Sequence, residues 1–233
     1  MQHIRYRLLL GFCAVLAFSF TLTGCKDEAE SGESAAVEAV VKTVAEVPEP
    51  VVNIDVEAAL RERVMGDANA PITISEHSSL TCGHCGNFHK TTFKEIKEKY
   101  IDTGKVKLVF ADFPLNGPAL HATLSARCIL DDAKYFDYIQ ELFETQDKWA
   151  YDVGYLSYLK ATASNYGLNE ATFSACLSSE ALQKGVLERV RENQTKHGLT
   201  STPSFVINGT EKLTGGQPLE AFEAAFKKTE TTE

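Results

Sequence analysis

Basic residues are fewer than acidic ones in this chain of 233 residues: 23 Lys and Arg stand against 32 Asp and Glu, a formal net charge of −9. Binding to nucleic acid depends on clustered basic residues, so this balance argues against nucleic acid as the main partner. It also argues against a polybasic grip on anionic lipid. Six cysteines are too few for a disulfide-dense module, and the 44% of hydrophobic residues suffice for one ordinary globular domain with some extra chain.

A hydrophobic run long enough to span a membrane is also missing. The apolar segment Leu8–Leu22 has about 15 residues, fewer than the ~20 that a spanning helix needs, and two arginines precede it, as in a secretory signal. The segment ends in Leu22-Thr23-Gly24-Cys25, which resembles a bacterial lipobox. We therefore expect residues 1–24 to be a lipoprotein signal peptide and Cys25 to carry the lipid anchor, in the bacterial periplasm. Ordinary secretion with an incidental cysteine is the alternative.

Aromatic residues are absent between Phe20 and Phe88. Within this stretch, residues 25–55 are rich in Glu, Ala, Val and Ser and carry eight acidic side chains against two lysines. Such a segment cannot bury enough apolar surface to offset the cost of ordering it, so we expect residues 25–55 to be an acidic flexible tether.

The rest of the chain alternates between strand and helix signals. Strands are expected at Ile72–Ile74, Val106–Phe110, Ser204–Ile207 and Lys212–Thr214, with a hairpin turn at Asn208-Gly209. Apolar spacing predicts helices at Val56–Val64, Gly86–Tyr100, Pro118–Leu130, Ala133–Thr145, Val153–Tyr166, Glu170–Leu177, Glu180–His197 and Leu219–Lys228. The order βαβ, helical block, ββα predicts an α/β domain made of residues 56–116 and 198–233, with residues 117–197 as a helical insert.

The residues that carry chemistry are Cys82-Gly83-His84-Cys85, which a strand precedes and a helix follows. A cysteine at a helix N-terminus is favoured as a thiolate by unpaired N–H groups and the helix dipole. Cys82 is therefore the predicted catalytic nucleophile, and Cys85, one turn into the helix, the more buried resolving thiol. His84 adds a polar neighbour that also favours the thiolate. Stabilising the thiolate stabilises the reduced form, which makes the pair a better oxidant of other proteins.

Zinc binding is the main structural alternative for these cysteines. A closed zinc site needs four ligands, and one C-x-x-C pair supplies two. No second C-x-x-C pair exists, and His84 and His89 are candidates by proximity alone. We therefore expect no metal, while a purely structural disulfide between Cys82 and Cys85 is the remaining alternative.

A threonine–proline step opens the strand predicted at Ser204–Ile207. A cis Thr202–Pro203 bond would turn the backbone toward the cysteine loop and present Thr202 as a strand-like partner for a substrate chain. An ordinary trans proline in a turn is the alternative.

Several motifs taken together resemble the DsbA-like family of bacterial thiol–disulfide oxidoreductases. They are Gly66-Asp67-Ala68-Asn69-Ala70-Pro71, Thr81-Cys82-Gly83-His84-Cys85, Phe113-Pro114-Leu115, Gly198 to Phe205, and Gly215-Gly216-Gln217-Pro218. The resemblance implies a thioredoxin fold with an inserted helical domain and a cis proline at Pro203. It also implies that Glu76 is a buried carboxylate that shuttles the proton of Cys85, where an exposed strand-end acid is the alternative. The Gly-His dipeptide departs from the Pro-His of DsbA and is familiar from eukaryotic disulfide isomerases.

Cys128 and Cys176 lie in apolar stretches of two predicted helices of the insert. They could be buried free thiols, which pack as small hydrophobes. The resemblance favours a structural disulfide instead, because some family members carry a second, non-catalytic cysteine pair.

These observations predict an exported thiol–disulfide oxidoreductase that introduces disulfides into other exported proteins. No separate cofactor is expected, since the redox-active disulfide lies in the chain. The expected partners are unfolded exported proteins with free thiols, a membrane-bound reoxidant of the quinone-linked type, and the membrane itself through Cys25; the protein is expected to be a monomer. A disulfide isomerase, a reductase, and a non-catalytic peptide-binding surface lipoprotein are the alternatives.

Overall fold

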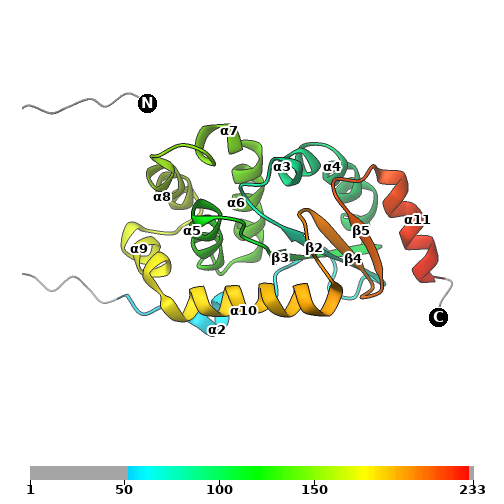
Figure 1. The fold of residues 1–233 in the computed structure, drawn as a ribbon, viewed down its shortest axis with the longest axis horizontal. Coiled ribbons are helices and arrows are strands. Elements are labelled where there is room, and N and C mark those ends of the chain that lie inside the picture. The colour runs from blue at the N-terminus through cyan, green and yellow to red at the C-terminus, as the bar shows by residue number, and fades with distance from the viewer. Residues whose placement is uncertain (1–51, 231–233) are drawn as a thin grey trace, which may run out of the picture. The chain divides into compact units, whose positions relative to one another are not determined.

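The computed structural model describes residues 52–230 of the chain (Figure 1). The expected signal peptide, the anchor Cys25 and the tether up to residue 51 lie outside the described residues. Asp55, at the expected end of the tether, caps helix α2 (Val56–Leu60), because its side chain accepts a hydrogen bond from the Ala58 N–H at 2.9 Å. Within residues 52–230, no helix has both the length and the apolar character needed to cross a membrane.

The described residues form a five-stranded mixed sheet in the order β1-β3-β2-β4-β5. The strands are β1 (Val64–Met65), β2 (Ile72–Ser78), β3 (Val106–Asp112), β4 (Ser204–Ile207) and β5 (Glu211–Thr214). Strands β2 and β3 are parallel, and the other three pairs are antiparallel. The first strand was not expected from the sequence. The β4–β5 hairpin turns at Asn208 and Gly209, with positive φ values of 44° and 77°, which is the backbone that a tight primed turn requires.

Helices cover both faces of the sheet (Figure 1). One face carries α3 (Gly83–Lys90), α4 (Thr92–Ile96), the π-helix η1 (Lys97–Ile101) and α11 (Leu219–Glu230). The aromatic rings of Phe88, Phe205 and Phe222 meet there, with centroids 4.6 to 5.7 Å apart, and join α3, β4 and α11 into one core. The other face carries α10 (Glu180–His197), whose Val190 packs with Val206 in a second cluster.

The single helix expected at Gly86–Tyr100 is interrupted at Thr91, where φ is −124° and ψ is −98°. The Thr91 hydroxyl donates to the Asn87 carbonyl at 2.8 Å, which competes with the regular helical hydrogen-bond ladder. The chain then continues as α4 and η1, so three short helices replace one long one.

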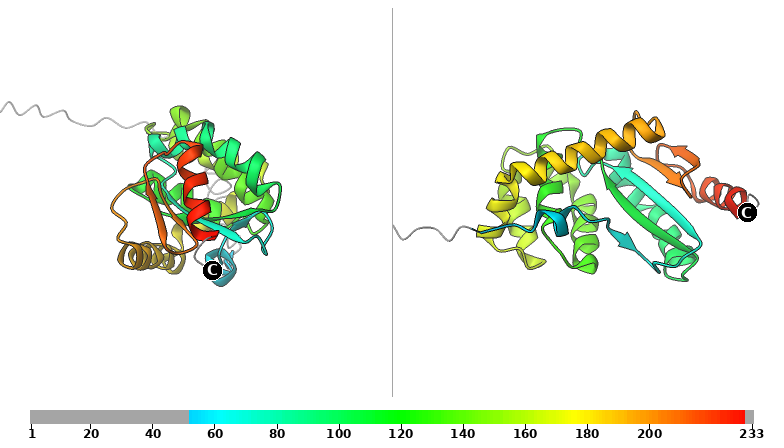
Figure 2. Two further views of the ribbon diagram at one scale, coloured as in Figure 1. Left: turned by 90° about the vertical axis from the view of Figure 1, so that its right-hand side faces the viewer. Right: turned by 90° about the horizontal axis from the view of Figure 1, so that it is seen from below.

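A helical segment separates β3 from β4. It contains α5 (Gly117–Arg127), α6 (Asp132–Glu144), α7 (Gln146–Trp149), α8 (Tyr155–Asn165), α9 (Glu170–Ser178) and α10. Four of these helices have an N-cap residue of a preferred type, whose side chain accepts a hydrogen bond from a backbone N–H of the first turn. These residues are Asn116, Asp131, Asn169 and Ser179. The sulfurs of Cys128 and Cys176 are bonded to each other and tie the end of α5 to α9. Figure 2 shows α10 running from this segment to the strands.

Buried arginines fasten the helical segment to the sheet. Arg127 on α5 donates from Nε to the Asp112 carboxylate on β3 at 2.6 Å, and both side chains are almost fully buried. It also donates to the Arg61 carbonyl at 2.8 Å. Arg63, which precedes β1, donates to the Arg127 carbonyl at 2.8 Å and to Asp132 on α6 at 3.0 Å. These contacts position α5 and α6 against β3 and the segment that leads into β1.

Candidate active site

Cys82 is the N-cap residue of α3, at the end of the loop that leaves β2. Its sulfur accepts a hydrogen bond from the Cys85 N–H at 3.3 Å, and its carbonyl accepts from the Gly86 N–H at 3.0 Å. The thiol therefore takes the place that a serine or aspartate side chain usually has at a helix start. Both cysteines are free thiols in this structure: Cys82 is half-buried, and Cys85, which begins the next turn, is fully buried.

Thr202 and Pro203 approach Cys82 at the end of the sheet where β2 finishes and β4 begins. Because β4 pairs antiparallel with β2, the residues just before β4 lie beside the residues just after β2. The Cys82 sulfur lies 3.5 Å from the Thr202 carbonyl oxygen, and the peptide bond between Thr202 and Pro203 is cis. Two segments 120 residues apart in sequence thus form one site.

The two thiols have opposite electrostatic environments. The pKa of Cys82 is lowered to about 5, chiefly by its hydrogen bond with the Cys85 side chain, and further by the Thr202 side chain and the N–H groups of Cys85 and His84, against the opposing effect of burial. Burial raises the pKa of Cys85, and the neighbouring Cys82 raises it further. Cys82 is therefore a thiolate at neutral pH, and Cys85 is a protonated thiol.

His84 contributes to this environment through its backbone. Its N–H helps to lower the pKa of Cys82, while its side chain is exposed and has no hydrogen bond or ion pair within the described part of the chain. The expected effect of the imidazole on Cys82 thus has no direct contact to support it.

Glu76 is fully buried on β2, on the same face of the sheet as Cys85. Its Oε1 accepts a hydrogen bond from the Ser78 hydroxyl at 2.5 Å, and the Ser78 side chain also lowers the pKa of Cys85 against the larger, opposing effect of burial. Ser78 therefore acts on both groups: its hydroxyl hydrogen-bonds to Glu76, and its side chain lowers the pKa of Cys85. Ser78 was not predicted from the sequence, although alternate residues of a strand share a face and Ser78 follows Glu76 by two.

Gln146 on α7 holds the cysteine loop and was also not predicted. Its Nε2 donates to the carbonyls of Leu80 and Cys82 at 2.8 and 3.0 Å. Gly86 of α3 lies against it, and a Cβ atom at Gly86 would collide with the Gln146 carboxamide. The glycine after Cys85 therefore makes room for the side chain that satisfies the loop carbonyls.

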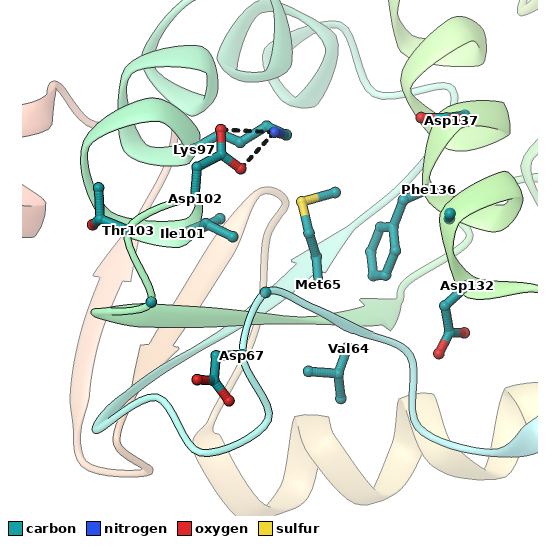
Figure 3. A pocket seen from close by; sticks show the side chains of 13 residues that line it. Val64, Met65, Asp67, Lys97, Ile101, Asp102, Thr103, Asp132, Phe136 and Asp137 are labelled. Atoms are coloured by element: carbon teal, nitrogen blue, oxygen red, sulfur yellow. Dashed lines mark hydrogen bonds and ion pairs between the residues drawn. The ribbon is translucent and has the colours of Figure 1, made fainter.

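The pocket shown in Figure 3, with a volume of about 670 Å³, lies away from the thiols. It is lined by residues of β1, η1 and α6, including Met65 and Phe136, and an ion pair between Lys97 and Asp102 lies on its wall. None of the predicted site residues lines it. In the described part of the chain, no three His, Cys, Asp or Glu side chains gather as a set of metal ligands.

The thioredoxin-like sheet, the helical insertion and the thiol pair at the start of α3 define a thioredoxin-fold protein with a redox-type site. A family model described as thioredoxin matches residues 58–228. The crystal structure of α-DsbA1 from Wolbachia pipientis is similar, with 31% identity and a TM-score of 0.67, covering 72% of this chain and 90% of that one. The chain belongs to the DsbA-like family of thioredoxin-fold proteins.

Two further relatives have related names. A Rickettsia felis protein, named as a proposed protein-disulfide oxidoreductase, is 29% identical over 167 residues, which are 72% of this chain and 59% of that protein. Disulfide bond formation protein D of Bacillus subtilis is 27% identical over 152 residues, covering 62% of this chain and 67% of that one. The chain thus spans little more than half the length of the Rickettsia relatives it matches.

Proposed function

We propose that this protein is an exported thiol–disulfide oxidoreductase that introduces disulfides into other exported proteins through Cys82 and Cys85. The observation that carries the proposal is the contrast between the two thiols: a half-buried Cys82 whose pKa is lowered to about 5, and a buried Cys85 whose pKa is raised. A stabilised thiolate favours the reduced form of the enzyme, so the disulfide form is a good oxidant. The names of the Rickettsia and Bacillus relatives support the same class of reaction.

The reaction would proceed by two exchanges. A substrate thiolate attacks the Cys82 sulfur of the Cys82–Cys85 disulfide, the S–S bond breaks, and Cys85 leaves and takes up a proton. A second substrate thiolate then attacks the first substrate sulfur, and Cys82 leaves as a thiolate. The substrate loses two electrons, which the enzyme holds as a dithiol until a membrane-bound, quinone-linked disulfide partner removes them. No bound cofactor takes part.

Glu76 would accept the proton that Cys85 releases and would return it when Cys85 becomes a thiol again. In this proposal the Cys85 S–H donates to the Ser78 oxygen while the Ser78 hydroxyl donates to Glu76, so a proton passes from sulfur to carboxyl in two transfers. This route matters most during reoxidation, when the buried Cys85 must lose its proton before it attacks Cys82.

Unfolded polypeptides are the substrates that the surroundings of Cys82 suit. The Leu115 and Tyr151 side chains are 55% and 80% exposed, and both residues hydrogen-bond to the cysteine loop, through Ser79 and Thr81. Apolar side chains of an unfolded chain can rest on them, while the backbone at Thr202 offers strand-like hydrogen bonds.

The test of this function is the refolding of reduced ribonuclease. The oxidised protein should restore ribonuclease activity, the Cys82→Ser variant should restore none, and the Cys85→Ser variant should accumulate a mixed disulfide at Cys82, because no second thiol can release it. Scrambled ribonuclease and insulin reduction, run in parallel, distinguish an isomerase and a reductase. A protein that binds peptides and exchanges no disulfide would contradict the proposal.

We also propose that Cys25 anchors the protein to a membrane of the periplasm. The support is the lipobox-like Leu22-Thr23-Gly24-Cys25 after an apolar run, and an acidic tether of ~30 residues that would span on the order of 30 Å as a coil. Replacing Cys25 by Ser should move the protein from the membrane fraction to the soluble periplasmic fraction without loss of thiol oxidation in vitro. Wild-type protein that is already soluble after export would contradict the anchor.

A further inference from the structure

The Glu76 carboxyl has a second buried partner besides Ser78. His89, on α3, is 3% exposed, and its Nε2 lies 2.9 Å from Glu76 Oε1. Ser78 and His89 both contact Oε1, while Oε2 has no hydrogen-bond partner within the described part of the chain. A proton that reaches the carboxyl from Ser78 therefore arrives at the oxygen that already faces His89.

Gln140 on α6 determines which nitrogen of His89 carries a hydrogen. Hydrogen bonds from Gln140 and Lys94 keep the pKa of the Glu144 carboxyl low, so this ionised group only accepts, and Gln140 Nε2 donates to it at 3.0 Å. The Gln140 oxygen is then the atom that lies 3.0 Å from His89 Nδ1. Because a carboxamide oxygen only accepts, Nδ1 carries a hydrogen in every charge state, and Nε2 is bare in the neutral ring.

Aromatic rings hold His89 in this orientation. Its ring stacks on Phe143 with centroids 4.0 Å apart, and Phe93 lies 4.6 Å away on another side. Charged side chains on the helices packed around it include Lys90 on α3, Lys94 and Glu95 on α4, and Glu141 and Glu144 on α6, all of which are exposed or half-buried. On β2, the neighbour of Glu76 is His77, whose pKa is lowered to about 4 by burial and by His197, so it stays neutral near pH 7.

We propose that His89, held by Gln140 in the tautomer with a bare Nε2, receives through Ser78 and Glu76 the proton that leaves Cys85. The inference rests on the proposed function and adds a further residue to it. During reoxidation the Cys82 thiolate attacks an incoming disulfide, one partner thiolate leaves, and a mixed disulfide forms. The Cys85 proton passes to His89, the Cys85 thiolate attacks the Cys82 sulfur, and the second partner thiolate leaves. His89 is thus a positioning and proton-holding residue that does not touch the reacting sulfurs.

The test separates the two exchanges in time. The reduced full chain is mixed with glutathione disulfide, and samples are quenched with acid and alkylated at successive times. Mass spectrometry then distinguishes the dithiol, the mixed disulfide and the Cys82–Cys85 disulfide by their masses. His89→Gln keeps a polar side chain beside Glu76 but cannot take a proton. It should slow the second exchange at least about tenfold near neutral pH, alter the pH dependence of that exchange, and leave the first exchange unchanged.

Two variants of Gln140 still test the inference if the substitution at the buried His89 prevents folding. Gln140→Leu, at a partly exposed site, should also slow the second exchange, because Nδ1 loses its acceptor, whereas Gln140→Glu retains an acceptor and should retain the rate. His121→Gln is the matched control, since His121 pairs with Tyr155 on α8 and is not connected to Glu76. A second exchange with wild-type rate and pH profile in both His89→Gln and Gln140→Leu would overturn the inference alone. A wild-type chain that forms no mixed disulfide would overturn the proposed function with it.

Discussion

The reduced protein should become harder to unfold as the pH rises from about 5 to about 8, and Cys82 should contribute a large part of the rise. The pKa of Cys82 is lowered to about 5 in the folded dithiol form, whereas a cysteine in an unfolded chain titrates near 8.5. A depressed folded pKa contributes stability above the unfolded value and loses it as the pH falls through the folded one. After allowance for the solvent exposure of Cys82, the gain between pH 5 and pH 7 should be about 1–2 kcal/mol.

Urea unfolding at several pH values measures this gain. The useful quantity is the difference between wild-type protein and Cys82→Ser, both with the Cys128–Cys176 bond intact, because His77 also has a lowered pKa and adds its own slope below neutral pH. Oxidised wild-type protein is a second control, since a cysteine in a disulfide does not titrate. Thiolate absorbance of the reduced protein gives the pKa of Cys82 directly. A difference that stays flat from pH 5 to 8, with a titration near 8.5, would remove the basis of the oxidase proposal.

Replacing Arg127 by Leu should destabilise the protein by about 3–5 kcal/mol, because it leaves the Asp112 carboxylate buried without its partner. The loss also leaves the Arg61 carbonyl, and the Phe110 carbonyl 3.4 Å away, without the guanidinium donor. Urea unfolding near neutral pH measures the change in the free energy of unfolding. The partners of Arg127 are Asp112, Arg61, Phe110 and Tyr135, none of which belongs to the candidate site, so the remaining folded protein should keep its thiol exchange.

Lys160→Leu is the matched control for Arg127→Leu. Lys160 pairs with Glu170 at 2.7 Å, but both side chains are well exposed, and such a pair contributes at most about 1 kcal/mol. The double variant Arg127→Leu with Asp112→Leu should recover part of the lost stability, because no unpaired charge remains buried. Equal effects of Arg127→Leu and Lys160→Leu would show that the buried pair adds little to stability.

Elements with local signals could be predicted from the sequence. Helix α10 spans Glu180–His197 as expected, because Ser179 caps its start and Gly198, with a φ of 61°, ends it in the left-handed region. Strand β4 spans Ser204–Ile207 as expected, because a proline precedes a short β-branched run and the Asn208-Gly209 turn follows it.

Elements that depend on distant partners could not be predicted in the same way. Strand β1 has two residues and exists only through its pairing with β3, where Val64 meets Val109. Helix α7 has four residues, and its Gln146 has a role only because the cysteine loop lies beside it. Neither propensity nor periodicity reports such contacts.

The residues of the candidate site also fall into two groups, those that the sequence predicts and those that it does not. Cys82 and Cys85 could be found from their spacing between a strand and a helix, and Thr202, Pro203 and Glu76 from a family resemblance. The network around Glu76 could not, because a histidine on an apolar helix face is more often part of the core than of a site. The contact between His89 and Glu76 depends on how α3 packs on β2, which the structure provides and the sequence pattern does not.

Because Cys82 and Thr202 are far apart along the chain, the two parts of the site are synthesised at different times. A ribosome delivers Cys82 120 residues before Thr202, and β4, which brings Thr202 to the loop, follows it. Gln146, which holds the loop carbonyls, arrives between them. A growing chain therefore carries Cys82 without the Thr202 contact that helps to lower its pKa. The complete environment of the thiolate forms only when the β4–β5 hairpin has joined the sheet, so the site is incomplete until that hairpin has been made.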